Sequence, residues 1–170
     1  MNSIRTIDDF LTEDEMKVLE EYFTGNIWKW GHTSTNNARV QKWFSAGLDD
    51  KPYFTEYLKE KIERDIDIKC ELVRVYANGQ TILNGGSWHA DIDSDGYLTA
   101  LLYVSDITRH DVDIVRGHTE FMLENGDIKS IQPIKNRLVV FDSRIVHQGC
   151  APEVPGFLRI SVAWKLKRIT

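Results

Sequence analysis

The sequence predicts an α+β domain that is mainly β, a barrel or jelly roll buttressed by helices near the N-terminus. Helical patterns come first, within residues 1–68, and alternating strand patterns fill residues 69–167. Asn125-Gly126, the strongest short signal for a β-hairpin, lies between two of these strand patterns. No linker or internal repeat divides the 170 residues, which are enough to bury a real core. We therefore predict one domain over residues 1–170, with a helical part at 1–68 and a barrel core at 69–167.

Two helices are predicted in the first part. Residues 12–15, Thr-Glu-Asp-Glu, form a capping-box pattern, apolar residues follow at helical spacing, and Gly25 is typical of a helix end. A second helix is predicted to begin near Pro52, which suits a first helical turn, and its apolar stripe continues to Ile66. We expect both apolar stripes to pack in the core.

Strand patterns follow, and the last of them carries an informative charge. The predicted strands are 70–76, 97–105, 119–124, 127–131, 137–141 and 157–166. One face of the last strand is continuously apolar, whereas Arg159 and Ser161 lie on the other. A charge in mid-strand is costly unless it has a partner or lines a wet cavity. Arg159 is therefore predicted to point into the barrel mouth, and Tyr76 and Tyr103 lie on strand faces that suit the same cavity.

Charge and composition disfavour some classes of partner. The net charge of −5 argues against nonspecific binding to nucleic acid or to an anionic membrane. No apolar run approaches the length of a membrane span, and residues 3–9 do not resemble a secretory signal. Because Cys70 and Cys150 are the only cysteines, we expect a cytoplasmic protein with reduced thiols, although a disulfide between them stays open. The oligomeric state is left open.

The strongest functional pattern is His89-Ala90-Asp91 with His147 far downstream. Two histidines and one carboxylate are the ligand set that holds iron(II) on one face and leaves other positions open for chemistry. Residues at i and i+2 in extended backbone project to the same side, so His89 and Asp91 can reach one ion. A His-x-Asp pair is weak evidence by itself, and His118-Thr119-Glu120 is a competing His-x-Glu pair.

Arg159 points to a co-substrate beside the metal. Three protein ligands leave three positions on an octahedral iron, where a 2-oxo acid can take two and dioxygen the third. A guanidinium is suited to carboxylates, so Arg159 can pair with the distal carboxylate of the acid. Ser161 and the Tyr103 hydroxyl can add neutral hydrogen bonds. The alternative is that these residues lie in ordinary loops and that Arg159 forms a buried ion pair.

Residues 72–165 resemble the iron(II)- and 2-oxoglutarate-dependent dioxygenases, in particular the prolyl 4-hydroxylase-like branch. The matching segments are Val75-Tyr76 with Gly79, Trp88-His89-Ala90-Asp91, Leu98-Thr99-Ala100-Leu101-Leu102-Tyr103-Val104, Gly117-His118-Thr119-Glu120-Phe121, Leu138-Val139-Val140-Phe141 with His147, and Arg159-Ile160-Ser161 with Trp164. The sequence departs from the family at Arg116, where a first glycine is common. The resemblance implies a double-stranded β-helix, which is a jelly-roll barrel.

The resemblance also implies residue roles. His89, Asp91 and His147 would be the iron ligands, and Arg159 would anchor 2-oxoglutarate with help from Tyr103 and Ser161. Tyr76 would lie near the co-substrate. His118 and Glu120 have no role in the family, which favours His89 and Asp91 as the metal pair. The implied reaction hydroxylates an unactivated C–H bond while 2-oxoglutarate is converted to succinate, and ascorbate often supports turnover in this branch.

The substrate is left open at this point. A prolyl residue in a peptide or protein follows from the resemblance, and a free amino acid or small molecule is the alternative. A non-catalytic metal-binding barrel and a cupin-like enzyme without a 2-oxo acid are further alternatives. The polar segments 32–47 and 106–116 are long enough to act as substrate loops. His32 and His110 are expected to be surface loop residues.

Overall fold

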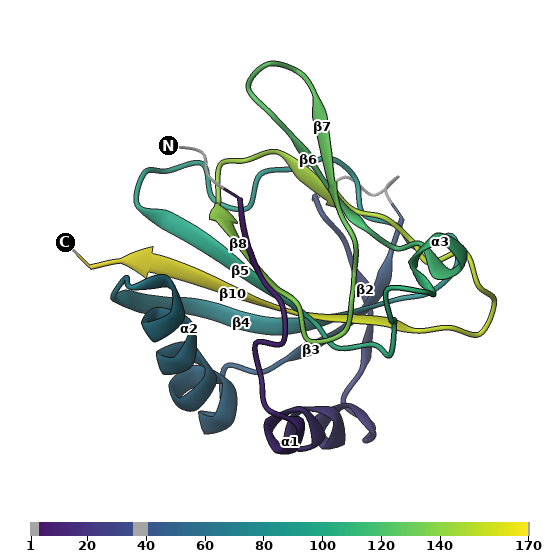
Figure 1. Ribbon diagram of the computed structural model, residues 1–170, viewed down its shortest axis with the longest axis horizontal. Helices are drawn as coiled ribbons and strands as arrows, with labels where there is room; N and C mark the ends of the chain where they lie inside the picture. Colours follow the sequence, from purple (N-terminus) through teal and green to yellow (C-terminus); the bar gives the residue numbers. More distant parts are fainter. Residues whose placement is uncertain (1–3, 36–40, 170) are drawn as a thin grey trace.

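A computed structural model describes residues 4–35 and 41–169, and these form two antiparallel sheets, with α1 and α2 on the outer side of the larger one (Figure 1). The large sheet has the strand order β1-β8-β5-β10-β4-β3-β2, and the small sheet has the order β7-β6-β9. The large-sheet strands are β1 Arg5–Ile7, β2 Lys29–His32, β3 Trp43–Gly47, β4 Cys70–Gln80, β5 Tyr97–Tyr103, β8 Leu138–Asp142 and β10 Arg159–Arg168. The remaining elements are β6 Thr119–Met122, β7 Ile128–Ile131, β9 His147–Gly149, α1 Glu13–Phe23, the π-helix η1 Tyr53–Leu58, α2 Lys59–Ile66 and α3 Val112–Val115. The predicted jelly-roll arrangement of strands with helices is confirmed.

The first helix begins as its capping box predicts. The Thr12 hydroxyl accepts a hydrogen bond from the Glu15 amide at 3.3 Å, and the Glu15 carboxylate accepts one from the Thr12 amide at 2.7 Å. Two backbone donors that the helix leaves unpaired are thereby satisfied. The second predicted helix starts as the π-helix η1, immediately after Pro52, and continues as α2.

The prediction of a helical part at 1–68 is incomplete, because this part also supplies three strands to the large sheet. β1 pairs with β8, and β2 and β3 extend the sheet beyond β4. The short strands lack a visible alternation of apolar and polar residues, so their pairing with distant strands decides their conformation. The segment 32–47, predicted to be irregular, therefore contains β3, and its residues 36–40 lie outside the described residues. The segment 106–116 contains the short helix α3.

The large sheet separates two apolar clusters. The first lies against the helices and contains, among others, Leu19, Phe54, Ile62, Val162 and Trp164. The second lies between the sheets and includes Tyr76, Tyr103, Phe121, Phe141 and Ala163. Alternate residues of β10 thus enter different layers, as strand parity predicts. The side chains of Arg159 and Ser161, on one face of β10, point into the space between the sheets.

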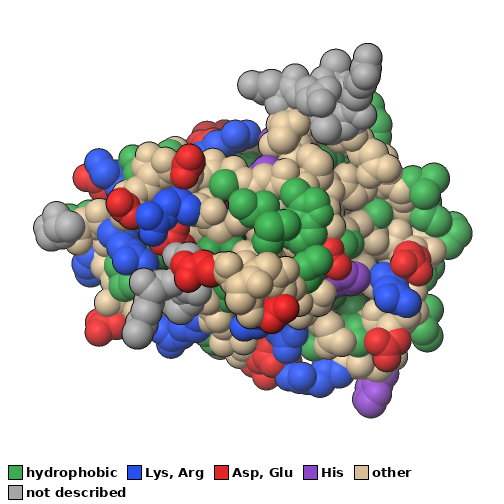
Figure 2. Space-filling model, turned by 90° about the horizontal axis from the view of Figure 1, so that it is seen from above, with side chains coloured by type: hydrophobic (Ala, Val, Ile, Leu, Met, Phe, Trp, Pro, Cys, Tyr) green, Lys and Arg blue, Asp and Glu red, His purple; other side chains and the backbone are tan. Residues whose placement is uncertain are grey.

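The surface mixes both signs of charge. On the face in Figure 2, which looks onto the molecule from above Figure 1, acidic and basic side chains surround a central group of hydrophobic side chains. None of the described helices is long and apolar enough to cross a bilayer. Cys70 and Cys150 are both free thiols, so the disulfide left open by the sequence does not form.

Candidate active site

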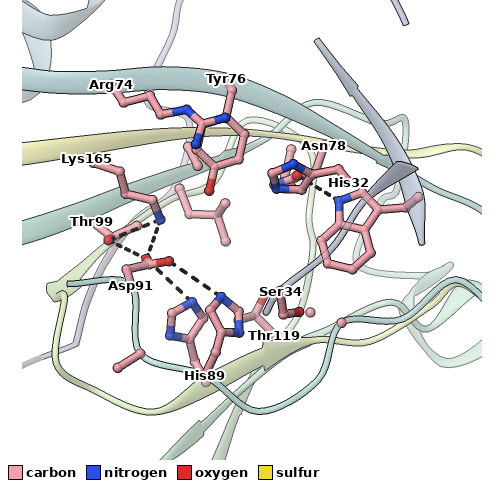
Figure 3. Close-up of a pocket in the computed structure, with 18 of the residues that line it drawn as sticks. His32, Ser34, Arg74, Tyr76, Asn78, His89, Asp91, Thr99, Thr119 and Lys165 are labelled. Carbon is pink, nitrogen blue, oxygen red and sulfur yellow. Dashed lines mark hydrogen bonds and ion pairs between the residues drawn. The ribbon is translucent and has the colours of Figure 1, made fainter. Parts of the chain in front are cut away.

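A cavity of about 340 Å³ lies between the two sheets and contains most of the residues that the sequence singled out (Figure 3). Strands β4, β5 and β10 of the large sheet supply one side, and β6 and β9 supply residues from the small sheet. The predicted site residues that line the cavity are Tyr76, His89, Asp91, His147, Arg159 and Ser161.

The structure brings His89, Asp91 and His147 together. One donor atom from each lies within 4.8 Å of the other two, so the three can face a single ion. His89 and Asp91 precede β5, and His147 begins β9, 58 residues after His89 in the sequence. The His89 amide donates to the His147 carbonyl at 3.0 Å, and the His147 amide returns a bond of 2.9 Å. This two-way backbone bridge fixes the two imidazoles side by side.

Both histidines present the same ring nitrogen to the cavity. Nδ1 of His89 lies 2.8 Å from the Ser87 carbonyl oxygen, and Nδ1 of His147 lies 2.9 Å from that of Ile145. A carbonyl can only accept, so Nδ1 carries the proton in each ring and Nε2 keeps a free lone pair. Burial lowers the pKa of His147 to about 4, against the opposing effect of Asp91. The rings are therefore prepared as neutral metal ligands.

The Asp91 carboxylate is held by one of its oxygens. Oδ2 accepts a hydrogen bond of 2.6 Å from the Thr99 hydroxyl and forms an ion pair with the Lys165 ammonium. Burial would raise the pKa of Asp91, but the positive charge of Lys165 outweighs it, so the pKa lies well below its usual value. The group is ionised, and Oδ1 is turned toward His89 at 3.5 Å. Nitrogen and carboxylate donors in this arrangement fit iron(II).

Arg159 is a buried cation whose partners are neutral. Its side chain is 2% exposed and donates to the Gly117 carbonyl, to Gln80 Oε1 at 2.7 Å and to the Thr119 hydroxyl at 3.1 Å. Burial lowers its pKa from the usual range. Within residues 4–35 and 41–169 no carboxylate pairs with it, so the alternative of a buried ion pair is wrong. A buried guanidinium of this kind is suited to an anion that enters the cavity.

Tyr103 lies behind the cavity and not on its wall. Its hydroxyl donates to Thr119 at 2.7 Å, and its ring lies 5.3 Å from the Arg159 guanidinium carbon. Ser161 lines the cavity with its hydroxyl 3.4 Å from Arg159 Nη1. Tyr76 also lines it, with its hydroxyl directed toward His89 in Figure 3. Thr119 thus stands between Tyr103 and the cavity.

The competing histidine–carboxylate pair lies on the opposite face of the small sheet. Thr119 points into the cavity, so its neighbours His118 and Glu120 point away from it. There they meet Cys150, and the three form a second group of possible metal ligands. Burial raises the pKa of the Cys150 thiol to about 11, so the sulfur is protonated at neutral pH. His89 and Asp91 are the pair that faces the cavity.

Several residues that line the cavity were not predicted from the sequence to belong to the site. Lys165 shares the β10 face of Arg159 and Ser161, a parity that could have identified it. Arg74 shares a face with Tyr76 in the same way. His32, expected in a surface loop, instead ends β2, and its ring lies 5.4 Å from that of Tyr76 inside the cavity. His110 is exposed in a loop, as expected.

Solved structures share this architecture over nearly the whole chain. A prolyl hydroxylase from Trichoplax adhaerens, in complex with a hypoxia inducible factor peptide fragment, has a TM-score of 0.75 and 18% identity over 98% of this chain and 84% of that one. A Pseudomonas putida prolyl-4-hydroxylase has a TM-score of 0.72 and 16% identity, covering 99% and 94%. HygX from Streptomyces hygroscopicus, with nickel, 2-oxoglutarate and hygromycin B bound, has a TM-score of 0.72 and 10% identity, covering 98% and 83%.

The chain has the fold of the 2-oxoglutarate-dependent oxygenases. No protein-family model and no curated protein matches the sequence. TM-scores of 0.72 and 0.75 establish a shared fold, whereas identities of 10–18% do not carry over an activity, so the chemistry must be argued from the site itself. The fold brings the candidate metal ligands His89, Asp91 and His147 and the buried Arg159 into one cavity.

Proposed function

We propose that this protein is an iron(II)- and 2-oxoglutarate-dependent dioxygenase that hydroxylates an unactivated C–H bond. The observation that carries the proposal is the position of Arg159, a buried cation with neutral partners, in the cavity of His89, Asp91 and His147. Burying an unpaired cation is costly, and a metal-binding barrel without a co-substrate would contain no anion to offset that cost. A cupin-like enzyme that uses no 2-oxo acid is disfavoured for the same reason.

Each residue has a defined task in the proposal. His89, Asp91 and His147 would hold iron(II), which supplies the activation of dioxygen that couples oxidative decarboxylation of 2-oxoglutarate to substrate hydroxylation. Arg159 binds the distal carboxylate of 2-oxoglutarate, and Ser161 lies beside it. Tyr103 acts through Thr119: the Thr119 hydroxyl accepts from both Tyr103 and Arg159, so its own proton is left to donate into the cavity.

We propose a prolyl or other residue of a peptide or protein as the substrate. The similarity to prolyl hydroxylases, one of them in complex with a peptide fragment, supports this choice. A small molecule is the second candidate, and the structure that contains hygromycin B supports it. We also propose that ascorbate supports turnover, and succinate formation with and without ascorbate tests this.

Binding and turnover together test the proposed chemistry. The protein is loaded with iron(II) and 2-oxoglutarate without oxygen, both affinities are measured, and succinate is then quantified in air. We expect succinate formation to be lost in Asp91→Ala and His147→Ala, and retained in His110→Ala, which removes an exposed histidine outside the cavity. Undiminished succinate formation in His147→Ala would contradict the iron site.

A second variant separates the co-substrate from the metal. Arg159→Ala removes one partner of a buried charge pair, a loss of about 2–5 kcal/mol, so 2-oxoglutarate affinity should fall roughly 30-fold or more. Iron affinity should remain, because Arg159 does not touch the three ligands. A wild-type protein that binds iron but forms no succinate with 2-oxoglutarate would favour the non-catalytic barrel instead.

A further inference from the structure

The cavity carries more positive than negative charge. Among the described residues that line it, Arg74, Arg159 and Lys165 are cations, and Asp91 supplies the carboxylate. Under the proposed function, the two charges of iron(II) and the two of 2-oxoglutarate cancel, so the surplus persists in the loaded enzyme. The whole chain has a net charge of −5, which makes this local excess of cations unusual.

The cations lie at two separate ends of the cavity. Arg159 and Lys165 are six residues apart on the same face of β10, a separation of about 20 Å in extended backbone. Lys165 lies opposite Arg74 in the register between β10 and β4. A five-carbon acid bound to Arg159 is too short to reach this second end. Arg74 and Lys165 are therefore not needed for the co-substrate.

Arg74 lines the cavity and packs on the Tyr76 ring. Its guanidinium carbon lies 4.4 Å from the centre of the Tyr76 ring, and the Lys165 ammonium lies 5.6 Å from the same ring. The Arg74 side chain is exposed and forms no ion pair with any acidic group in the part of the chain that the structure describes. In Figure 3, Arg74 and Tyr76 lie on one side of the cavity and His89 on the other, while Lys165 reaches Asp91.

His32 lies close to Arg74 and Lys165 and is affected by their positive charge. Its ring lies 5.4 Å from the Tyr76 ring. Burial lowers the pKa of His32 most strongly, and the positive charges of Arg74 and Lys165 lower it further. The ordinary role for Lys165 is to hold Asp91, which it does. The Arg74 guanidinium takes no part in that ion pair.

We propose that Arg74, with Lys165 behind it, binds a carboxylate group of the substrate. The proposal rests on the proposed function and names the substrate class for it. A guanidinium fixed by an aromatic ring presents its planar donors to a carboxylate in a defined orientation. A cavity of about 340 Å³ lies at the lower end of the ~300–1,000 Å³ typical for ligand pockets. Beside 2-oxoglutarate it admits a small acid or a short acidic peptide segment.

Matched acids and amides test this proposal. The probes are a panel of N-acetyl amino acids with the matching N-acetyl amino acid amides, and acetyl-dipeptide amides that contain Glu or Gln. Binding is measured by calorimetry on the protein loaded with iron(II) and 2-oxoglutarate without oxygen. The first arm tests a small acid and the second an acidic peptide. The variant is Arg74→Gln, and the control is Arg64→Gln, which removes an exposed arginine from α2.

We expect at least one acid to bind at least about 10-fold more tightly than its amide, the difference expected for one charge-assisted hydrogen bond. Arg74→Gln should abolish this preference, and Arg64→Gln should keep it. Equal binding of acids and amides, no binding of any acid, or a preference that survives in Arg74→Gln would overturn the proposal.

The outcome is distinguishable from failure of the proposed function. Arg74 contacts neither the iron ligands nor Arg159, so Arg74→Gln should bind iron(II) and 2-oxoglutarate with wild-type affinities. If the wild-type protein binds neither, the proposed function fails. If it binds both and forms succinate but shows no preference for acids, the carboxylate site alone fails.

Discussion

Gly117 packs against Arg159 so closely that a Cβ atom at position 117 would lie 2.9 Å from Arg159 Cδ. Gly117 also has a φ of +77°, a backbone conformation that residues with a side chain rarely adopt. Its carbonyl accepts a hydrogen bond from Arg159 Nε. The glycine therefore supports the arginine in two ways, by making room for it and by bonding to it.

Gly117→Ala should weaken 2-oxoglutarate binding while iron binding persists. The methyl group must displace the Arg159 side chain, and a guanidinium moved by even a fraction of an ångström loses its alignment with a carboxylate. Gly126→Ala is the matched control: Gly126 has a φ of +85° with no neighbouring atom within 4 Å. Both variants should lose stability, but calorimetry should find weaker 2-oxoglutarate binding in Gly117→Ala alone. Equal co-substrate affinities in the two variants would contradict this role.

Tyr103→Phe should weaken 2-oxoglutarate binding only slightly. The phenol hydroxyl donates to Thr119 and does not reach the cavity. One neutral hydrogen bond contributes about 0.5–1.5 kcal/mol, so the dissociation constant should rise about 2- to 10-fold. Titration of 2-oxoglutarate measures this change. A loss as large as that of Arg159→Ala would instead indicate direct contact between Tyr103 and the co-substrate.

Thr99→Val should lower iron affinity. The valine keeps the shape of the side chain but removes the hydrogen bond of 2.6 Å that orients the Asp91 carboxylate. Groups that orient a metal ligand are worth about 10- to 100-fold in metal affinity, and anaerobic iron titration measures the loss. Thr6→Val, at an exposed position of β1, should leave the affinity unchanged. An unaltered affinity in Thr99→Val would show that Lys165 alone is enough to hold Asp91.

Glu63→Gln should destabilise the fold in a pH-dependent way. The Glu63 side chain is 3% exposed, pairs with Lys59 at 2.9 Å and accepts from the Cys70 amide at 2.6 Å. Burial would raise its pKa, but these partners outweigh burial and lower it from the usual 4.5. Because the folded pKa lies below the unfolded one, the stabilisation is present above about pH 4.5 and is lost as the pH falls through the folded pKa.

Denaturant unfolding at several pH values tests this expectation. At pH 7, Glu63→Gln should lower the free energy of unfolding by about 1–3 kcal/mol, and the difference from wild type should shrink toward acid pH. Glu60→Gln, at an exposed position of α2, is the control and should change little. A difference that does not vary with pH would mean that packing, and not charge, accounts for the loss.

The candidate metal ligands and Arg159 could be predicted because each follows from strand parity or from local spacing. His89 and Asp91 project to the same side of an extended segment, and Arg159 lies on the β10 face that the core does not use. Lys165 lies on the same face of β10. It is near the C-terminal end of the strand, however, where a lysine is commonly exposed to solvent, so the sequence did not single it out. Its burial, to 8% exposure, depends on Asp91, which is distant in the sequence.

The strands β2 and β3 could not be predicted from their own residues. They are short, and neither repeats a pattern of apolar and polar residues. β3 takes its conformation from pairing with β4, which is distant in the chain, and β2 then pairs with β3 at the edge of the sheet. His32 was misplaced for this reason. Tyr103 was placed on the correct face, but residue types alone do not show that Thr119 and Arg159 lie between it and the cavity.

The two-way backbone bridge between His89 and His147 has a consequence for how the protein acquires its metal. Conformational entropy is lost when the sheets assemble, so little of it remains to be lost when an ion arrives. The apoprotein should therefore be a stable species, unlike a zinc finger, which unfolds without its ion. Under the proposed function, iron should therefore bind to the folded protein and exchange for another divalent ion without refolding.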